Sequence, residues 1–208
     1  MEGEEQARAY CERLTASEAT IARLEAFAVR LKDENTRQNL VSSASLEQVW
    51  QRHIADSLQL LEHVPGEPNT WLDLGTGAGP PGLVVAIARP DMPMYLIESR
   101  KRRAEWLQSV CDELGLSRCV VLANRLEDVD RIAAGVISAR AFAPLDRLFR
   151  LSTRFSTPET IWLLPKGRSA QIELADQPPE IQCMFHVEPS LTDPQAGIIV
   201  GRGAPVSR

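Results

Sequence analysis

The sequence has no stretch that would cross a membrane or direct secretion. None of its apolar runs approaches the ~20 residues that span a bilayer. The N-terminus MEGEEQARAY is polar and acidic, whereas a signal peptide is basic and then apolar. The sequence therefore predicts a soluble, cytoplasmic protein with no membrane partner.

Cysteine and histidine are too few and too scattered for a metal or disulfide framework. The four cysteines form no CxxC pair, and none of the three histidines lies at ligand spacing from them. With 44% apolar and 25% charged residues, the 208-residue chain has the composition of one globular domain with a modest extension, and we expect a monomer. We predict no metal site, and reduced, mostly buried thiols at Cys11, Cys111, Cys119 and Cys183.

The net charge of −5 argues against a nucleic-acid partner for the surface as a whole, but the charges are unevenly distributed. Residues 100–168 contain 13 basic and 8 acidic residues, a net charge of +5. This segment opens with RKRR at 100–103. Two interpretations are equally open: a local face that attracts phosphates, or a solvated helix surface.

Apolar spacing predicts helices first and an α/β core afterwards. Residues 21–31 and 46–60 repeat apolar or small side chains at intervals of three and four, which is typical of amphipathic helices. After the breakers at 65–68, short apolar runs alternate with helix-length segments such as 104–114. We predict a helical extension over 1–66 and a parallel α/β core over 67–208, with strands at 70–74, 94–97, 119–123, 135–138 and 160–164, and an edge strand at 197–201.

The stretch WLDLGTGAGPPG at 71–82 follows the first predicted strand, the usual place for a ligand loop in a parallel sheet. Two motifs overlap in it. The glycines at 77, 79 and 82 spell the dinucleotide pattern GxGxxG, whereas Asp73 with the glycines at 75, 77 and 79 spells DxGxGxG, typical of S-adenosylmethionine enzymes. Asp73 favours S-adenosylmethionine, because a carboxylate disfavours a pyrophosphate but can accept hydrogen bonds from a cationic amino acid.

Glu98 ends the second predicted strand, where an acidic side chain can bind a ribose diol. This position indicates a nucleoside and leaves open which cofactor carries it. His53 and Asp56 also stand out, three residues apart in the extension. A pair satisfied within one helix face and an active-site role are equally open for them.

Seven short motifs narrow the choice among methyltransferases. They occur in this order: NLVS at 39–42, RHIADS at 52–57, DLGTGAGPPG at 73–82, ARPD at 88–91, NRLED at 124–128, SARAFAPL at 138–145 and PKG at 165–167. Together they resemble the bacterial small-subunit ribosomal RNA methyltransferase G family, known as RsmG or GidB. The resemblance covers about residues 20–167 and weakens beyond them.

The resemblance implies a class I methyltransferase fold, with a Rossmann-like, mostly parallel seven-stranded sheet between helices. It also implies an enzyme that transfers a methyl group from S-adenosylmethionine to N7 of one guanine in 16S ribosomal RNA, leaving S-adenosylhomocysteine. Naked RNA, an assembling particle and the mature small subunit are all compatible partners. Two alternatives remain: a class I methyltransferase with a small-molecule substrate, and a cofactor-binding ribosome assembly module without turnover.

The resemblance also implies roles for individual residues. The glycines of the loop line the amino-acid end of the cofactor, Glu98 its ribose, and Leu126 and Glu127 its adenine. Arg125, Arg140 and Lys166, each placed just after a predicted strand, position the RNA substrate, and no general base is expected. The full cofactor-binding set is Asp73, Gly75, Thr76, Gly77, Gly79, Pro80, Glu98, Ser99, Leu126, Glu127 and Arg140.

Two departures from the family pattern limit these implied roles. Pro80 occupies a loop position where most relatives carry a bulkier apolar residue. Near the C-terminus, Gln195, Ala196 and Gly197 stand where the family tends to carry an Arg-His pair. We expect the contact made by that pair to be missing.

Overall fold

The protein is built on one seven-stranded sheet. The computed structural model describes residues 1–205. The strand order is β3-β2-β1-β4-β5-β7-β6, with the first five strands parallel and β7 antiparallel to both of its neighbours. The strands are β1 (Trp71–Leu74), β2 (Met94–Ile97), β3 (Cys119–Leu122), β4 (Val136–Ser138), β5 (Ile161–Gly167), β6 (Phe185–Pro189) and β7 (Gly197–Arg202).

Five predicted strands are confirmed, and three details were wrong. The run GIIVG is not at the edge: β7 lies between β5 and β6, and five of its six residues are buried. An apolar run without alternation is typical of a strand buried on both faces, as an interior strand of a sheet is. The prediction missed β6, and β5 continues to Gly167, so Lys166 lies within a strand and not after one.

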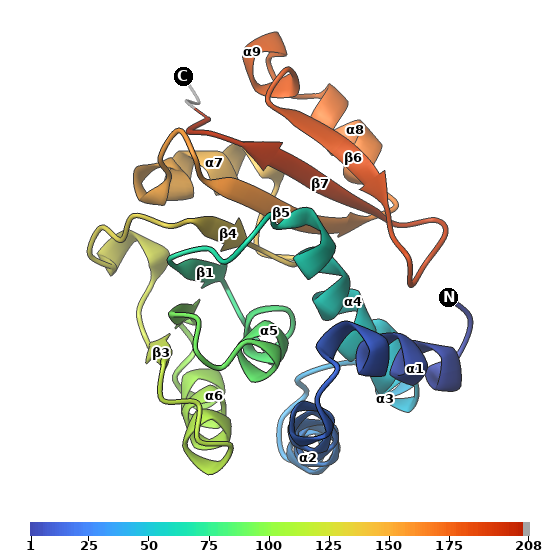
Figure 1. Cartoon of the computed structure of the whole chain (residues 1–208). Helices are drawn as coiled ribbons and strands as arrows, with labels where there is room; N and C mark the ends of the chain where they lie inside the picture. Colours follow the sequence, from blue (N-terminus) through green and yellow to red (C-terminus); the bar gives the residue numbers. More distant parts are fainter. Residues whose placement is uncertain (206–208) are drawn as a thin grey trace.

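Helices cover both faces of the sheet (Figure 1). The helical pattern predicted over 46–60 is not one regular helix, since it contains the six-residue π-helix η1 and the 3₁₀ helix η2. The longer helices are α1 (Glu4–Thr15), α2 (Glu18–Asn35), α5 (Gly82–Ala88), α6 (Lys101–Glu113) and α7 (Leu145–Ser152); the shorter ones are α3 (Ser43–Glu47), η1 (Trp50–Ala55), α4 (Asp56–Leu58), η2 (Gln59–His63), η3 (Leu126–Asp128), η4 (Thr153–Phe155), α8 (Ala170–Ala175) and α9 (Pro179–Gln182).

Two hydrophobic clusters lie against the sheet. One joins the apolar faces of α1, α2, α5 and α6, and the other joins those of α7, α8 and α9. The helical extension thus shares a core with the sheet, and Phe27 of α2 reaches the glycine loop, where its Cε2 lies 3.3 Å from the position of a Cβ at Gly79. None of the helices within residues 1–205 is both long and apolar enough to cross a membrane.

The cysteine prediction was half right. Cys11 and Cys111 are buried in the core, but Cys119 is only partly buried and Cys183 is exposed. Cys119 begins the edge strand β3 and packs against the core from that edge, whereas Cys183 follows the short surface helix α9.

Candidate functional site

The glycine loop after β1 has a backbone conformation that requires glycine. Gly75, Gly77 and Gly79 have φ values of 64°, 62° and 124°, in the region that L side chains rarely adopt. The loop is fastened to its neighbours: the Thr76 amide donates to the Ile97 carbonyl over 3.1 Å, and Trp106 Nε1 of α6 donates to the Ala78 carbonyl over 3.0 Å. The loop is therefore preformed by its own sequence and by β2 and α6.

Asp73 lies beneath this loop, fully buried. Its Oδ1 accepts a hydrogen bond of 2.5 Å from Ser138 Oγ, which itself accepts one of 2.8 Å from Trp71 Nε1, and its Oδ2 accepts from the Gly82 amide over 3.2 Å. Burial raises the pKa of Asp73 to about 6, against the lowering effect of these hydrogen bonds. From this position Asp73 shapes the loop and the start of α5, and its contact with the amino group of a ligand stays a prediction.

Glu98 clamps the loop to α6. Its Oε2 accepts from the Gly77 amide over 3.0 Å and its Oε1 from the Arg100 amide over 2.7 Å, with 5% of the residue exposed. A carboxylate has about four lone-pair sites, so each oxygen keeps one for a further donor such as a ribose hydroxyl. Of the neighbouring predicted residues, Ser99 is exposed, whereas Thr76 and Pro80 are buried.

The segment after β3 carries three of the predicted site residues, of which one is buried and two are exposed. Leu126 is buried under the η3 turn, while Glu127 and Arg125 are exposed and form a loose ion pair of 4.0 Å. Arg125 is thus a cation open to solvent. Its prediction as a substrate-side residue remains compatible with this exposure.

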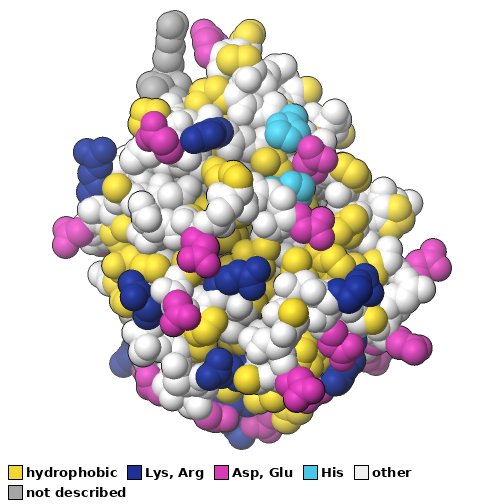
Figure 2. Space-filling view, in the orientation of Figure 1, with side chains coloured by type: hydrophobic (Ala, Val, Ile, Leu, Met, Phe, Trp, Pro, Cys, Tyr) yellow, Lys and Arg dark blue, Asp and Glu magenta, His cyan; other side chains and the backbone are white. Residues whose placement is uncertain are grey.

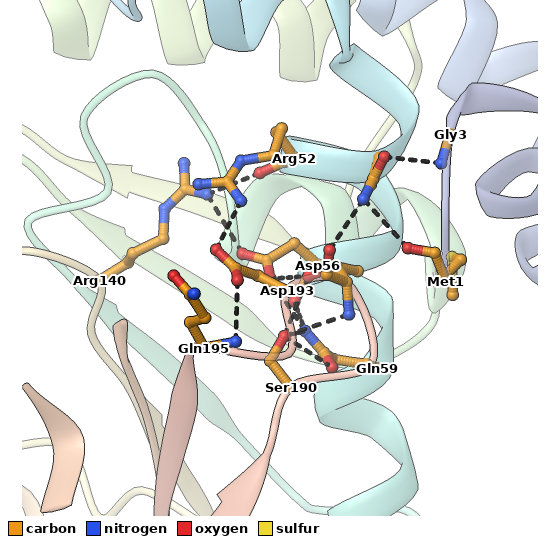
Figure 3. A network of polar contacts seen from close by, with 11 residues as sticks. Met1, Gly3, Arg52, Asp56, Gln59, Arg140, Ser190, Asp193 and Gln195 are labelled. Atoms are coloured by element: carbon orange, nitrogen blue, oxygen red, sulfur yellow. Dashed lines mark hydrogen bonds and ion pairs between the residues drawn. The ribbon is translucent and has the colours of Figure 1, made fainter. Parts of the chain in front are cut away.

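Arg140, in contrast, is only partly exposed and is held by internal contacts. Its guanidinium lies 3.5 Å from Asp56 Oδ2, donates to the Arg52 carbonyl over 3.2 Å and lies 3.4 Å from His53 Nδ1. Figure 3 shows its side chain reaching from the loop after β4 toward the helix that carries Arg52 and Asp56. Arg140 therefore joins the loop after β4 to the N-terminal extension.

The same network extends to the loop before β7. Thr192 Oγ1 and Gln59 Nε2 donate to Asp56 Oδ1 over 2.6 and 2.9 Å, and Arg52 pairs with Asp193 at 3.0 Å (Figure 3). The Gln195 amide donates to Asp193 Oδ1 over 3.0 Å. A cavity of about 220 Å³ lies here, with Ala196 and Gly197 in its lining, at the position where the Arg-His pair was expected to be missing.

His53 is neutral and its tautomer follows from its partners. Arg140 is a donor only, so His53 Nδ1 accepts from it, and the Nε2–H donates to Ser45 Oγ over 3.1 Å. Burial, with the positive charges of Arg140 and Arg52, lowers the pKa of His53 to about 3. His53 and Asp56 are therefore not a pair within one helix face; both contact Arg140.

Lys166 is also held by internal contacts. Its Nζ donates to the Ala143 carbonyl over 2.8 Å and pairs with Glu173 Oε2 at 2.9 Å, and 6% of its side chain is exposed. Arg140 and Lys166 thus fasten one loop, residues 139–144, from two sides. That loop lies at the carboxyl end of β4, beside the glycine loop.

Several residues that contact the predicted site residues lie within the sequence motifs but were not predicted as site residues. Ser138 and Phe142 lie within the SARAFAPL motif, and Arg52 within RHIADS, yet their contacts could not be read from spacing. Asp193 lies more than 130 residues from Arg52 in the chain, so its pairing depends on the antiparallel return of β7. Phe142 contacts Gly75 and lines an open cavity of about 780 Å³ together with Lys166.

Comparison with known proteins identifies the family. The family model for rRNA small subunit methyltransferase G matches residues 20–195. Proteins named ribosomal RNA small subunit methyltransferase G from Erythrobacter litoralis and Novosphingobium aromaticivorans are 57% and 55% identical to this chain. The first alignment covers 96% of both chains; the second covers 91% of this chain and 83% of the relative.

The fold is shared with more distant methyltransferases. The solved structure of precorrin-6y C5,15-methyltransferase from Geobacter metallireducens has a TM-score of 0.54 to this chain at 10% identity, covering 79% of this chain and 91% of that one. At this identity the likeness concerns the fold alone, and it confirms the predicted class I methyltransferase architecture. With the match to its own family over most of its length, the chain belongs to the rRNA small subunit methyltransferase G family.

Proposed function

We propose that this protein transfers a methyl group from S-adenosylmethionine to N7 of one guanine in 16S ribosomal RNA. Besides the family membership, one observation carries the proposal: the loop at 75–79 is a preformed backbone cradle, and Glu98 closes one side of it. Such a cradle suits the amino-acid and ribose parts of a nucleoside cofactor. When bound, S-adenosylmethionine supplies an electrophilic methyl group.

The chemistry makes modest demands on the protein. Guanine N7 has a free lone pair and no proton, so displacement at the methyl carbon needs no general base. The side chains have to place N7 of the base in line with the methyl group and to exclude other orientations of the base. We propose that Arg140 and Lys166 do this by holding the 139–144 loop, whereas Arg125, which is exposed, contacts RNA directly.

The direct test is to map N7-methylguanine in 16S ribosomal RNA from cells with and without this protein. We expect one modified guanine that disappears with the protein and returns with the wild-type gene. Calorimetry should show binding of S-adenosylmethionine and S-adenosylhomocysteine, and no binding of NAD. Tighter binding of NAD than of S-adenosylhomocysteine would contradict the interpretation of the glycine loop.

The start of α6 is the proposed phosphate contact. Arg100, Lys101 and Arg102 are exposed at the end of the sheet that carries the glycine loop. On the face drawn in Figure 2, basic and acidic side chains are interspersed, without one continuous basic patch. Phosphate contacts add to RNA affinity through counterion release.

Replacing Arg100, Lys101 and Arg102 by Ala is expected to weaken RNA binding and to flatten its salt dependence by about 2–3 in log–log slope, because each phosphate contact releases about one ion. S-adenosylhomocysteine affinity should barely change. Filter binding at several salt concentrations measures the slope. The control replaces three exposed arginines elsewhere, Arg13, Arg118 and Arg202; an equal change in both triple variants would leave RKRR as a solvated helix surface.

The rate of methyl transfer is expected to be nearly independent of pH from about 6 to 8.5. N7 needs no deprotonation, and burial lowers the pKa of His53 to about 3, so that this side chain stays neutral throughout the range. His53→Gln should keep the flat profile, even if the rate falls because the acceptor beside Arg140 changes. Single-turnover rates at saturating RNA and cofactor test this. A tenfold rise per pH unit that is lost in His53→Gln would make His53 a general base.

A further inference from the structure

The loop between β4 and α7 fixes the position of one aromatic side chain, that of Phe142. Arg140 fastens one end of residues 139–144 to the extension, and Lys166 donates to the Ala143 carbonyl at the other end. Between these ties, Ala141 has a φ of 52°, a left-handed conformation that turns the backbone sharply. The next residue, Phe142, is therefore held in place from both sides.

Phe142 meets the glycine loop with the edge of its ring. A Cβ built on Gly75 would lie 2.6 Å from Phe142 Cδ2 and 3.4 and 3.6 Å from the two neighbouring ring atoms. The distance to Cδ2 is much shorter than the distances to its two bonded neighbours, which means that the Cβ position lies near the plane of the ring. If it lay above a face of the ring, the three distances would differ much less. The faces of the ring are thus not occupied by Gly75. Phe142 is partly exposed and lines the cavity of about 780 Å³.

The charges around this cavity suit an acceptor that becomes positive. Guanine gains a full positive charge as its N7 is methylated, so an unpaired cation beside it would oppose the reaction. The two cations in the cavity lining, Arg140 and Lys166, lie 3.5 Å from Asp56 and 2.9 Å from Glu173. An aromatic face, in contrast, carries partial negative charge and attracts a cation.

We propose that Phe142 stacks on the acceptor guanine and stabilises the positive charge that develops on the purine during methyl transfer. This inference rests on the proposed function. In the reaction the N7 lone pair forms the new N–C bond, and the C–S bond breaks with its electron pair retained on sulfur, which becomes a neutral thioether. No proton moves. The positive charge passes from sulfur to the purine, so the attraction of the ring for the base grows toward the transition state.

The test replaces Phe142 by mono-, di- and trifluorophenylalanine, which keep the ring and its shape but successively weaken the negative charge of its face. We expect the single-turnover rate to fall at each step, by about 5- to 30-fold in total, as for a desolvated cation–π contact. The substrate is small ribosomal subunits from a strain that lacks this protein. The matched control fluorinates Phe149, a buried ring of α7 packed against Trp162, where the rate should not change.

Variants with natural amino acids at position 142 separate stacking on the guanine from simple filling of space beside Gly75. Phe142→Tyr should keep most of the rate, whereas Phe142→Leu, which still fills space beside Gly75, should lower kcat about 5- to 30-fold and change S-adenosylhomocysteine affinity less than about twofold. A rate independent of fluorination would overturn the inference while leaving the proposed function intact. If the wild-type protein methylates no guanine in these subunits, in assembling particles or in naked 16S ribosomal RNA, the proposed function itself fails. The fluorinated series remains decisive even if Phe142→Leu does not fold.

Discussion

Gly77→Val is expected to abolish detectable binding of S-adenosylhomocysteine while leaving the fold largely intact. Gly77 has a φ of 62°, which costs a β-branched side chain about 1–3 kcal/mol. An added Cβ itself has space, because the nearest atoms to it, Arg103 Nη1 and the Gly75 carbonyl oxygen, lie at 3.6 Å. The loop is therefore expected to relax to another conformation, in which the Gly77 amide no longer meets Glu98 and the cradle is lost.

Gly115→Val is the matched control for this variant. Gly115 has nearly the same φ, 65°, with no atom within 4 Å of an added Cβ, and it lies after α6 at the far end from the loop. Both variants should lose similar stability in thermal unfolding, but only Gly77→Val should lose the cofactor in calorimetry. Equal loss of binding in both, or full binding in Gly77→Val, would remove the loop conformation as the basis of cofactor affinity.

Arg140→Met is expected to lower the single-turnover rate about 100-fold, because it releases the loop that carries Phe142 and small displacements of reacting groups are costly. The ion pair with Asp56 is only 25% and 20% exposed at its two side chains. Its loss leaves a carboxylate with one partner fewer, so we also expect a decrease of about 1–3 kcal/mol in the free energy of unfolding. The affinity for S-adenosylhomocysteine should stay within about twofold, since Arg140 points to the extension and not to the glycine loop.

Arg125→Ala separates this positioning role from direct RNA contact. Arg125 is exposed, so its loss should reduce the salt slope of RNA binding by about one and affect the rate at saturating RNA little. Arg140→Met should do the opposite, with an unchanged slope and a low rate. If Arg140→Met instead flattens the slope and keeps the rate, Arg140 contacts a phosphate and the internal network is not needed for catalysis.

Strand positions were predictable because each depends on a short stretch of chain. The runs at 94–97 and 119–123 alternate with helices of suitable length, and local apolar content is sufficient to identify them. The position of β7 in the sheet was not predictable in this way. Whether a strand lies at the edge depends on what pairs beside it, and β6, which does so, carries polar residues that weaken its own signal.

The glycine loop was the most completely predictable part of the site. Its positive φ values follow from a local requirement that only glycine meets without strain, so the residue types alone indicated the conformation. The role of Asp73 was not predictable to the same degree. Its motif indicated a ligand contact, but the buried hydrogen bonds to Ser138 and Gly82 come from β4 and α5, and only folding brings these together.

The sequence by itself determined the family, the five parallel strands and the cofactor loop, because these are carried by residues that are near one another in the chain. The tertiary structure decided what the charged residues do. Arg140 and Lys166 look like Arg125 in the sequence, yet two of the three are tied inside the protein and one is exposed. A side chain's surroundings depend on segments as distant as residue 56 for Arg140, and no local pattern encodes that proximity.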